Sequence, residues 1–158
     1  MLAKTGALSI TLLTASLLLG FASNSTAATD DFRSTDGGPA IDAQKEKVVI
    51  QVSDKDPSKW NLSLNNARNV QAALGGADKV DVEIVVYGPG IGMLEMDSVV
   101  GGRVDDALSD GIDIVACQNT MSATGLTEAD MLPDIGYVPA GVIEIMEKQK
   151  QGYAYIRP

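Results

Sequence analysis

The sequence predicts an α/β protein, a three-layer α/β/α sandwich around a mostly parallel sheet of about five strands. Two observations predict it. Short runs of β-branched residues recur along the chain from residue 47 onward, and segments with apolar residues at helical spacing separate them. Strands that are apolar at nearly every position are typical of parallel sheets, which are covered on both faces. We therefore expect one folded domain over residues 46–158.

The first half of this domain begins with a predicted strand at residues 47–53 (KVVIQVS). Asp56 then stands at the N-cap of a helix, Pro57 at its first position, and apolar residues follow at helical spacing until Gly75. Residues 82–87 (VEIVVY) repeat the strand pattern, and a glycine-rich turn follows at residues 88–92 (GPGIG).

This turn does not fit a phosphate-binding loop. Its third glycine falls one position too early for the dinucleotide pattern, and no Lys-Ser or Lys-Thr pair follows it. The apolar cluster of Met93, Leu94 and Met96 comes next. We expect it in the core or at a subunit contact, because methionine fills irregular apolar gaps well.

The next helix is predicted to be capped by Ser98 and to end at Gly111, and a third strand follows at residues 112–116. A short helix is expected before Gly125. Thr127 and Asp130 then form a pattern that resembles a capping box.

The last part of the domain predicts a brief strand at residues 136–138, a helix, and a final strand at residues 153–156. The helix is expected to place Val142, Ile145, Met146 and Gln149 on one side and to pair Glu144 with Lys148 on its solvent face.

The N-terminus predicts export. Lys4 gives a positive start, residues 7–22 are apolar, and small residues precede a cleavage position near Ala27 or Ala28. We expect a signal peptide at residues 1–28, a flexible linker at residues 29–45, and a periplasmic product with no stable membrane anchor after cleavage. The apolar run is shorter than the roughly 20 residues that a spanning helix needs.

Composition excludes several functions. The formal charge of −9 and a pI near 4.3 argue against a nucleic-acid partner. The chain contains no histidine, which excludes a Ser-His-Asp hydrolase, a Cys-His protease and a histidine-ligated metal, and one cysteine cannot form a redox dithiol. We expect no cofactor and no metal. For Asp54, Asp56 and Glu95, solvation is a more common explanation than Ca²⁺ binding.

Cys117 is the remaining candidate for chemistry. Ligands of open α/β sheets bind outside the carboxyl ends of the strands, and Cys117 follows one of these ends. Helix N–H groups at that position would stabilise a thiolate, whereas a cysteine after an apolar strand is also commonly buried and inert. The predicted pocket residues at this edge are Gln118, Asn119, Thr120, Asp54, Gly88 and Gly90.

The chain resembles the DsrE/DsrF-like family, in particular its exported branch. The resemblance lies in residues 56–61 (DPSKWN), 87–90 (YGPG), 115–121 (VACQNTM), 137–141 (YVPAG) and 152–158 (GYAYIRP). It implies a Rossmann-like fold that assembles into homo-oligomers, with trimers and hexamers familiar in the family. In sulfur-relay members a cysteine after a central strand carries a persulfide, and Cys117 matches that position. Those relays are cytoplasmic, so the resemblance names no donor or acceptor protein for an exported chain.

Two hypotheses follow. The first is sulfur binding or transfer through a persulfide on Cys117, with a sulfur donor or acceptor protein as partner. The second is a non-catalytic, homo-oligomeric module that binds a small ligand or a protein and in which Cys117 is structural.

Overall fold

The computed structural model describes residues 45–158, and the folded part of the chain is built on one sheet of five parallel strands in the order β4-β3-β2-β1-β5. The predicted α/β fold is confirmed. The predicted signal peptide lies outside the described residues, as does the predicted linker apart from Lys45. The strands are β1 (Glu46–Val52), β2 (Val80–Val86), β3 (Asp113–Cys117), β4 (Gly136–Val138) and β5 (Ala154–Ile156).

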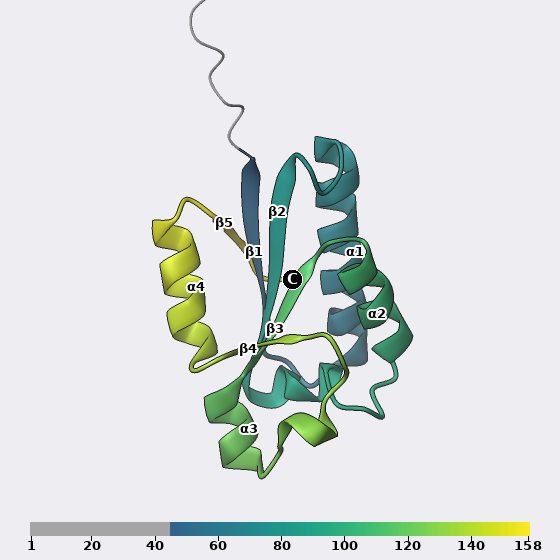
Figure 1. Ribbon diagram of the computed structural model, residues 1–158, viewed down its shortest axis with the longest axis vertical. Helices are drawn as coiled ribbons and strands as arrows, with labels where there is room; N and C mark the ends of the chain where they lie inside the picture. Colours follow the sequence, from purple (N-terminus) through teal and green to yellow (C-terminus); the bar gives the residue numbers. More distant parts are fainter. Residues whose placement is uncertain (1–44) are drawn as a thin grey trace, which may run out of the picture. The chain divides into compact units, whose positions relative to one another are not determined.

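Helices cover both faces of the sheet, with α1 and α2 on one side and α4 on the other (Figure 1). The helices are α1 (Pro57–Leu74), α2 (Gly101–Ser109), α3 (Gln118–Thr124) and α4 (Gly141–Lys150), with 3-10 helices η1 (Gly88–Met93) and η2 (Glu128–Asp130). The larger apolar core fills the space between the sheet and α1 and α2. The core under α4 is small and centres on Val49, Val85 and Ile145.

The start of α1 forms as its sequence predicts. The Asp56 carboxylate accepts a hydrogen bond from the Ser58 N–H at 2.9 Å, and Pro57 occupies the first turn. At the other end Gly75 adopts φ 98°, which is the left-handed conformation that glycine tolerates. The capping box of Thr127 and Asp130 is also present, although it begins a 3-10 helix.

The start of α2 differs from the prediction. The helix begins at Gly101, its N-cap is Val100, and no side chain caps it. The Ser98 hydroxyl accepts a hydrogen bond from the Val100 N–H at 3.4 Å. Ser98 therefore closes a local turn before the helix instead of capping the helix itself.

The glycine-rich segment also differs, because residues 88–93 wind into η1 instead of a plain turn. This places Met93 and Leu94 in the core with no solvent exposure, while Met96 remains exposed. Met93 and Leu94 are thus core residues, and they do not form the uncovered surface that would suggest a subunit contact.

Helix α4 lies in a different rotation from the predicted one. Ile145 packs on the sheet as expected, but Val142 and Met146 are each 51% exposed. Lys148 instead turns toward the sheet and pairs with Glu83 of β2, while its predicted ion pair with Glu144 is present at 3.7 Å. The buried carboxylate of Glu83 fixes this rotation, because an unpaired buried charge is very costly.

In the part of the chain that the structure describes, no helix has the length and apolarity required to cross a membrane.

Candidate functional site

Cys117 ends β3 and occupies the N-cap position of α3. Its backbone is extended, with φ −77° and ψ 112°, and its side chain makes no capping hydrogen bond. The residue is 5% exposed, and it is the one cysteine of the chain, so no disulfide can form within the chain. The strand-to-helix junction thus places a nearly buried thiol next to the first N–H groups of a helix.

The surroundings of Cys117 favour the thiolate. Burial alone would raise the pKa of the thiol, but the Thr120 hydroxyl and the N–H groups of Gly141, Thr120 and Asn119 outweigh it, and the pKa lies below its ordinary value. These donors come from two elements, since Asn119 and Thr120 belong to α3 and Gly141 begins α4.

A third element contacts the Thr120 hydroxyl. The N–H of Gly88, at the start of η1, donates to Thr120 Oγ1 at 2.9 Å. Because this bond occupies a lone pair of the oxygen, the single hydroxyl hydrogen remains free to be donated to Cys117. The first residue of η1 therefore positions a hydroxyl that lowers the pKa of the thiol at the end of β3.

Two contacts hold the start of α4 against the thiol. The Asn119 N–H donates to the carbonyl oxygen of Pro139 at 3.2 Å, which ties α3 to the segment before α4. A Cβ on Gly141 would lie 3.0 Å from Cδ1 of Tyr87, so a glycine is required for this close approach. The N–H of Asn119 is thus engaged by the backbone of the segment that leads into α4.

Tyr87 adds a neutral phenol beside this group. Burial raises its pKa, and the neighbouring Tyr155 and the Cys117 thiolate raise it further, whereas Arg157 and Ser53 lower it. The net direction is upward, so Tyr87 keeps its proton at neutral pH. A neutral phenol next to the thiol adds no negative charge that would oppose the thiolate.

A cavity of about 720 Å³ lies at the same edge of the sheet. Cys117 itself does not line it, but Asn119 and Thr120, which lower the pKa of the thiol, do, and so does Gly88, which donates to the Thr120 hydroxyl. A ligand in this cavity would lie next to the group that carries Cys117. The complete lining is Lys55, Gly88, Pro89, Ile91, Gly92, Glu95, Asn119, Thr120, Ala123, Thr124 and Leu126.

Among the predicted pocket residues, Gly88, Asn119 and Thr120 come together at this cavity, whereas the others do not line it. Gly90 is buried against β1, because a Cβ there would lie 2.7 Å from the carbonyl oxygen of Val52. This glycine serves close packing of the backbone.

Gln118 and Asp54 also lie outside the lining of the cavity. Gln118 is exposed at the start of α3. Asp54 forms ion pairs of 3.7 Å with Lys59 and with Arg157, so it links the loop after β1 to the C-terminal end of the chain.

Sequence reasoning missed Gly141 and Lys55 and gave Glu95 no role in a ligand pocket. Lys55 and Glu95 line the cavity, and the position of Lys55 just after β1 was a usable signal under the rule that ligands bind at strand ends. The effect of the Gly141 N–H on the pKa of Cys117 could not be predicted by this rule, because it depends on how α4 approaches α3.

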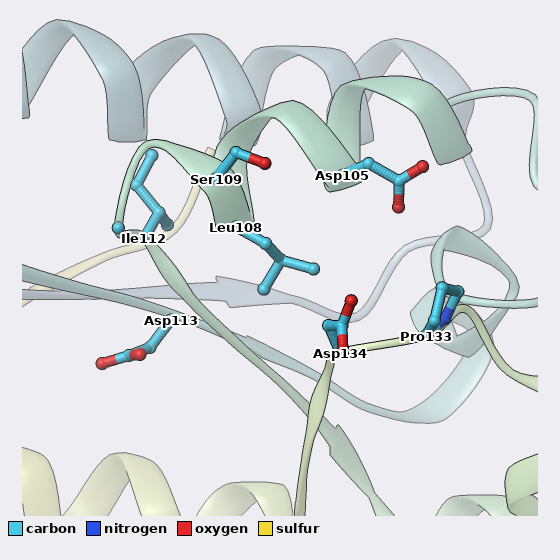
Figure 2. Close-up of a pocket in the computed structure, with 8 residues that line it drawn as sticks. Asp105, Leu108, Ser109, Ile112, Asp113, Pro133 and Asp134 are labelled. Carbon is cyan, nitrogen blue, oxygen red and sulfur yellow. The ribbon is translucent and has the colours of Figure 1, made fainter.

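A second hollow, of about 550 Å³, lies at the start of β3 and is lined by Asp105, Asp113 and Asp134 among others. Figure 2 shows the carboxylate of Asp113 pointing away from those of Asp105 and Asp134. Within residues 45–158 no cluster of carboxylate or thiol side chains is arranged to hold a metal ion. This hollow has neither the thiol nor converging charges.

Known proteins match the chain at the level of family and fold. The family model described as DsrE/DsrF-like matches residues 46–158. A solved protein of unknown function from Methanobacterium thermoautotrophicum, MTH1491, is 35% identical with a TM-score of 0.68, and the match covers 72% of this chain and all of that one. No curated protein matches the chain.

More distant structures share the fold alone. BT1422 from Bacteroides thetaiotaomicron, a conserved protein of unknown function, is 19% identical with a TM-score of 0.59, and the match covers 72% of this chain and 95% of that one. The ychN protein from E. coli is 7% identical with a TM-score of 0.58, with coverage of 72% and 99% respectively.

Proposed function

The chain belongs to the DsrE/DsrF-like family, and from this premise we propose that it binds or transfers sulfane sulfur as a persulfide on Cys117. The observation that carries the proposal is the position of Cys117 at the end of β3 and at the N-cap of α3, where the Thr120 hydroxyl and N–H groups from α3 and α4 lower the pKa of the thiol. They stabilise negative charge on sulfur, which a thiolate nucleophile and a persulfide anion both need.

The sulfur-loading step requires no cofactor. The Cys117 thiolate attacks the outer sulfur of a polysulfide, a sulfur–sulfur bond forms, and the old sulfur–sulfur bond breaks. The attacked outer sulfur is the protonated end of a hydrogen polysulfide, so the electron pair of the broken bond leaves with the shortened polysulfide and the transferred sulfur arrives as Cys117–S–SH, which then loses its proton to the solvent. Transfer to an acceptor thiolate is the same reaction in reverse.

Intact mass spectrometry of the full chain after incubation with polysulfide tests this proposal. We expect wild type to gain the mass of one sulfur atom and the Cys117→Ser variant to gain none. Equal uptake by both proteins, or no uptake by wild type, would refute it. Wild type treated with a reductant after loading should return to its original mass.

We propose that this reaction takes place in the periplasm, because the N-terminus has the pattern of a signal peptide. Expression of the full chain in a Gram-negative host should give a periplasmic protein whose first residue follows Ala27 or Ala28. Recovery of the uncleaved chain from the cytoplasm would contradict this part of the proposal.

A second function, that of a homo-oligomeric binding module, is favoured by a different observation. Val142, Ile143 and Met146 of α4 are each 51% exposed and are neighbours on the helix surface. Apolar side chains gathered in this way are typical of a subunit or partner contact. Light scattering of the full chain tests it, with a trimer or hexamer expected, and a monomer at all concentrations would count against it.

A further inference from the structure

The cavity lined by Asn119 and Thr120, which separate it from Cys117, contains two charges of opposite sign. Lys55 follows β1, Glu95 follows η1, and both line the same space of about 720 Å³. Neither side chain forms an ion pair with another residue between 45 and 158. A cation and an anion that have no ion-pair partners are thus both available to a ligand.

Gly92 lines the cavity next to Glu95. A Cβ on Gly92 would lie 3.6 Å from Oε1 of Glu95 and 3.5 Å from the indole ring of Trp60. Both are ordinary van der Waals distances, so a methyl group would fit at this position and would lie against the carboxylate. A larger side chain would occupy the space next to the carboxylate.

The rest of the wall combines apolar and hydrogen-bonding groups. Pro89, Ile91, Ala123 and Leu126 contribute apolar surface, and Thr124 adds a hydroxyl. The volume lies within the range of roughly 300–1,000 Å³ that is usual for small-molecule sites. Such a wall suits a small molecule with a short apolar middle and charged ends.

We propose that this cavity binds a low-molecular-weight persulfide that carries both an ammonium and a carboxylate group, in the class of an amino-acid persulfide. Its carboxylate lies at Lys55, its ammonium lies at Glu95, and its outer sulfur approaches Cys117 past Thr120. This inference rests on the proposed function and names the chemical class of the sulfur donor.

The transfer balances without another reactant. The Cys117 thiolate attacks the outer sulfur of R–S–SH, giving Cys117–S–SH and R–S⁻, and the electron pair of the broken bond leaves with the donor thiolate. An inorganic polysulfide is an anion with no ammonium group, so Lys55 attracts it but Glu95 repels it, whereas a zwitterion is attracted by both residues. The paired charges of the wall therefore favour the zwitterion over the inorganic donor.

Binding can be measured without the reaction. In the Cys117→Ser variant, calorimetric titration with S-methyl-L-cysteine, an unreactive probe with the same charged ends, should show binding. Glu95→Gln and Lys55→Gln, each added to this variant, should weaken the affinity at least about threefold, since each removes one charge pair.

Two matched variants control for net charge. Asp97→Asn and Lys79→Gln remove the same charges from exposed residues that do not line the cavity, and both should bind the probe as the parent does. All variants should melt within a few degrees of the parent, because none of the replaced side chains is buried. Equal affinity of Glu95→Gln and Asp97→Asn, or no binding of the probe, would overturn the inference.

Loading of the otherwise wild-type protein separates this inference from the proposed function. Cysteine persulfide should load Cys117 faster than inorganic polysulfide does, and Glu95→Gln should reduce that preference. If polysulfide loads Cys117 but neither preference nor probe binding is seen, the inference fails and the proposed function stands. If neither donor loads Cys117, the proposed function fails. The transfer of sulfur from an amino-acid persulfide then fails as well, even if the cavity binds the probe.

Discussion

Replacing Thr120 with Val removes the hydroxyl that lowers the pKa of Cys117 and leaves the shape of the side chain nearly unchanged. We expect the pKa of Cys117 to rise, because the thiolate loses a donor while its burial remains. Valine has no oxygen, so the Gly88 N–H also loses its acceptor. The variant should therefore be somewhat less stable as well.

The size of the effect follows from the value of one hydrogen bond to a charged group, about 1.5–3 kcal/mol. That is a change of about 10- to 100-fold in the equilibrium between thiol and thiolate. The variant has less thiolate, but a more basic thiolate is a stronger nucleophile, with a Brønsted slope of about 0.4–0.5. Roughly half of the decrease in rate that the smaller thiolate fraction would cause, on a logarithmic scale, is therefore recovered. The alkylation rate at a pH below the pKa should fall about 3- to 15-fold.

Ultraviolet absorbance of the thiolate as a function of pH measures the ionisation directly, and it does not depend on access to the sulfur. The spectrum of Cys117→Ser is subtracted. The pKa values of Tyr87, Tyr137 and Tyr153 are raised by burial, so their ionisation interferes less near neutral pH.

Thr124→Val is the matched control. The Thr124 hydroxyl donates to the backbone oxygens of Thr120 and Met121, at 2.9 and 3.2 Å, and does not contact the sulfur. Thr120→Ser keeps a hydroxyl and should restore most of the wild-type titration. A Thr120→Val protein that titrates like wild type would refute the role of this hydroxyl.

Two further predictions concern α4. Lys148→Met leaves the buried Glu83 without its cation, and the free energy of unfolding in urea should fall by about 3–5 kcal/mol at pH 8. Burial raises the pKa of Glu83 in the folded protein, so folding favours the protonated form of this carboxyl group. The decrease in the free energy of unfolding should therefore become smaller as the pH falls toward 5. A decrease that does not depend on pH would contradict this. Gly141→Ala places a methyl group about 3 Å from the Tyr87 ring, so the free energy of unfolding should fall by about 1–3 kcal/mol. The pKa of Cys117 should rise, because the N–H of residue 141 moves away from the thiol. A Gly141→Ala protein with wild-type stability and wild-type titration would show that the close approach is not needed.

The sheet could be predicted because its signals are local. Each strand is a short apolar run, and α1 is marked by Asp56 and Pro57 at one end and Gly75 at the other. The rotation of α4 could not be predicted, because it depends on Glu83, a carboxylate placed on the facing strand some 60 residues earlier in the chain. Helical spacing alone could not place Lys148 against that carboxylate.

The site could be predicted in part for the same reason. Parallel strands bring their carboxyl ends to one edge, so Gly88, Thr120 and Cys117 could be expected together. The N–H of Gly141 could not, because it reaches the thiol only through the approach of α4, which the close contact with Tyr87 defines. The sequence thus indicated the edge of the sheet where Cys117 and the cavity lie, but did not identify every group that lowers the pKa of the thiol.

The central claim is that Cys117 carries sulfane sulfur, and locating the added sulfur within the chain tests it most directly. The full chain is loaded with isotopically labelled polysulfide, its persulfides are alkylated, and trypsin releases the peptide of residues 104–148 that contains Cys117. We predict one labelled sulfur per chain, on Cys117, and its loss when an acceptor thiol is added. Label at any other residue, or an unlabelled Cys117 in a folded protein, would contradict the account.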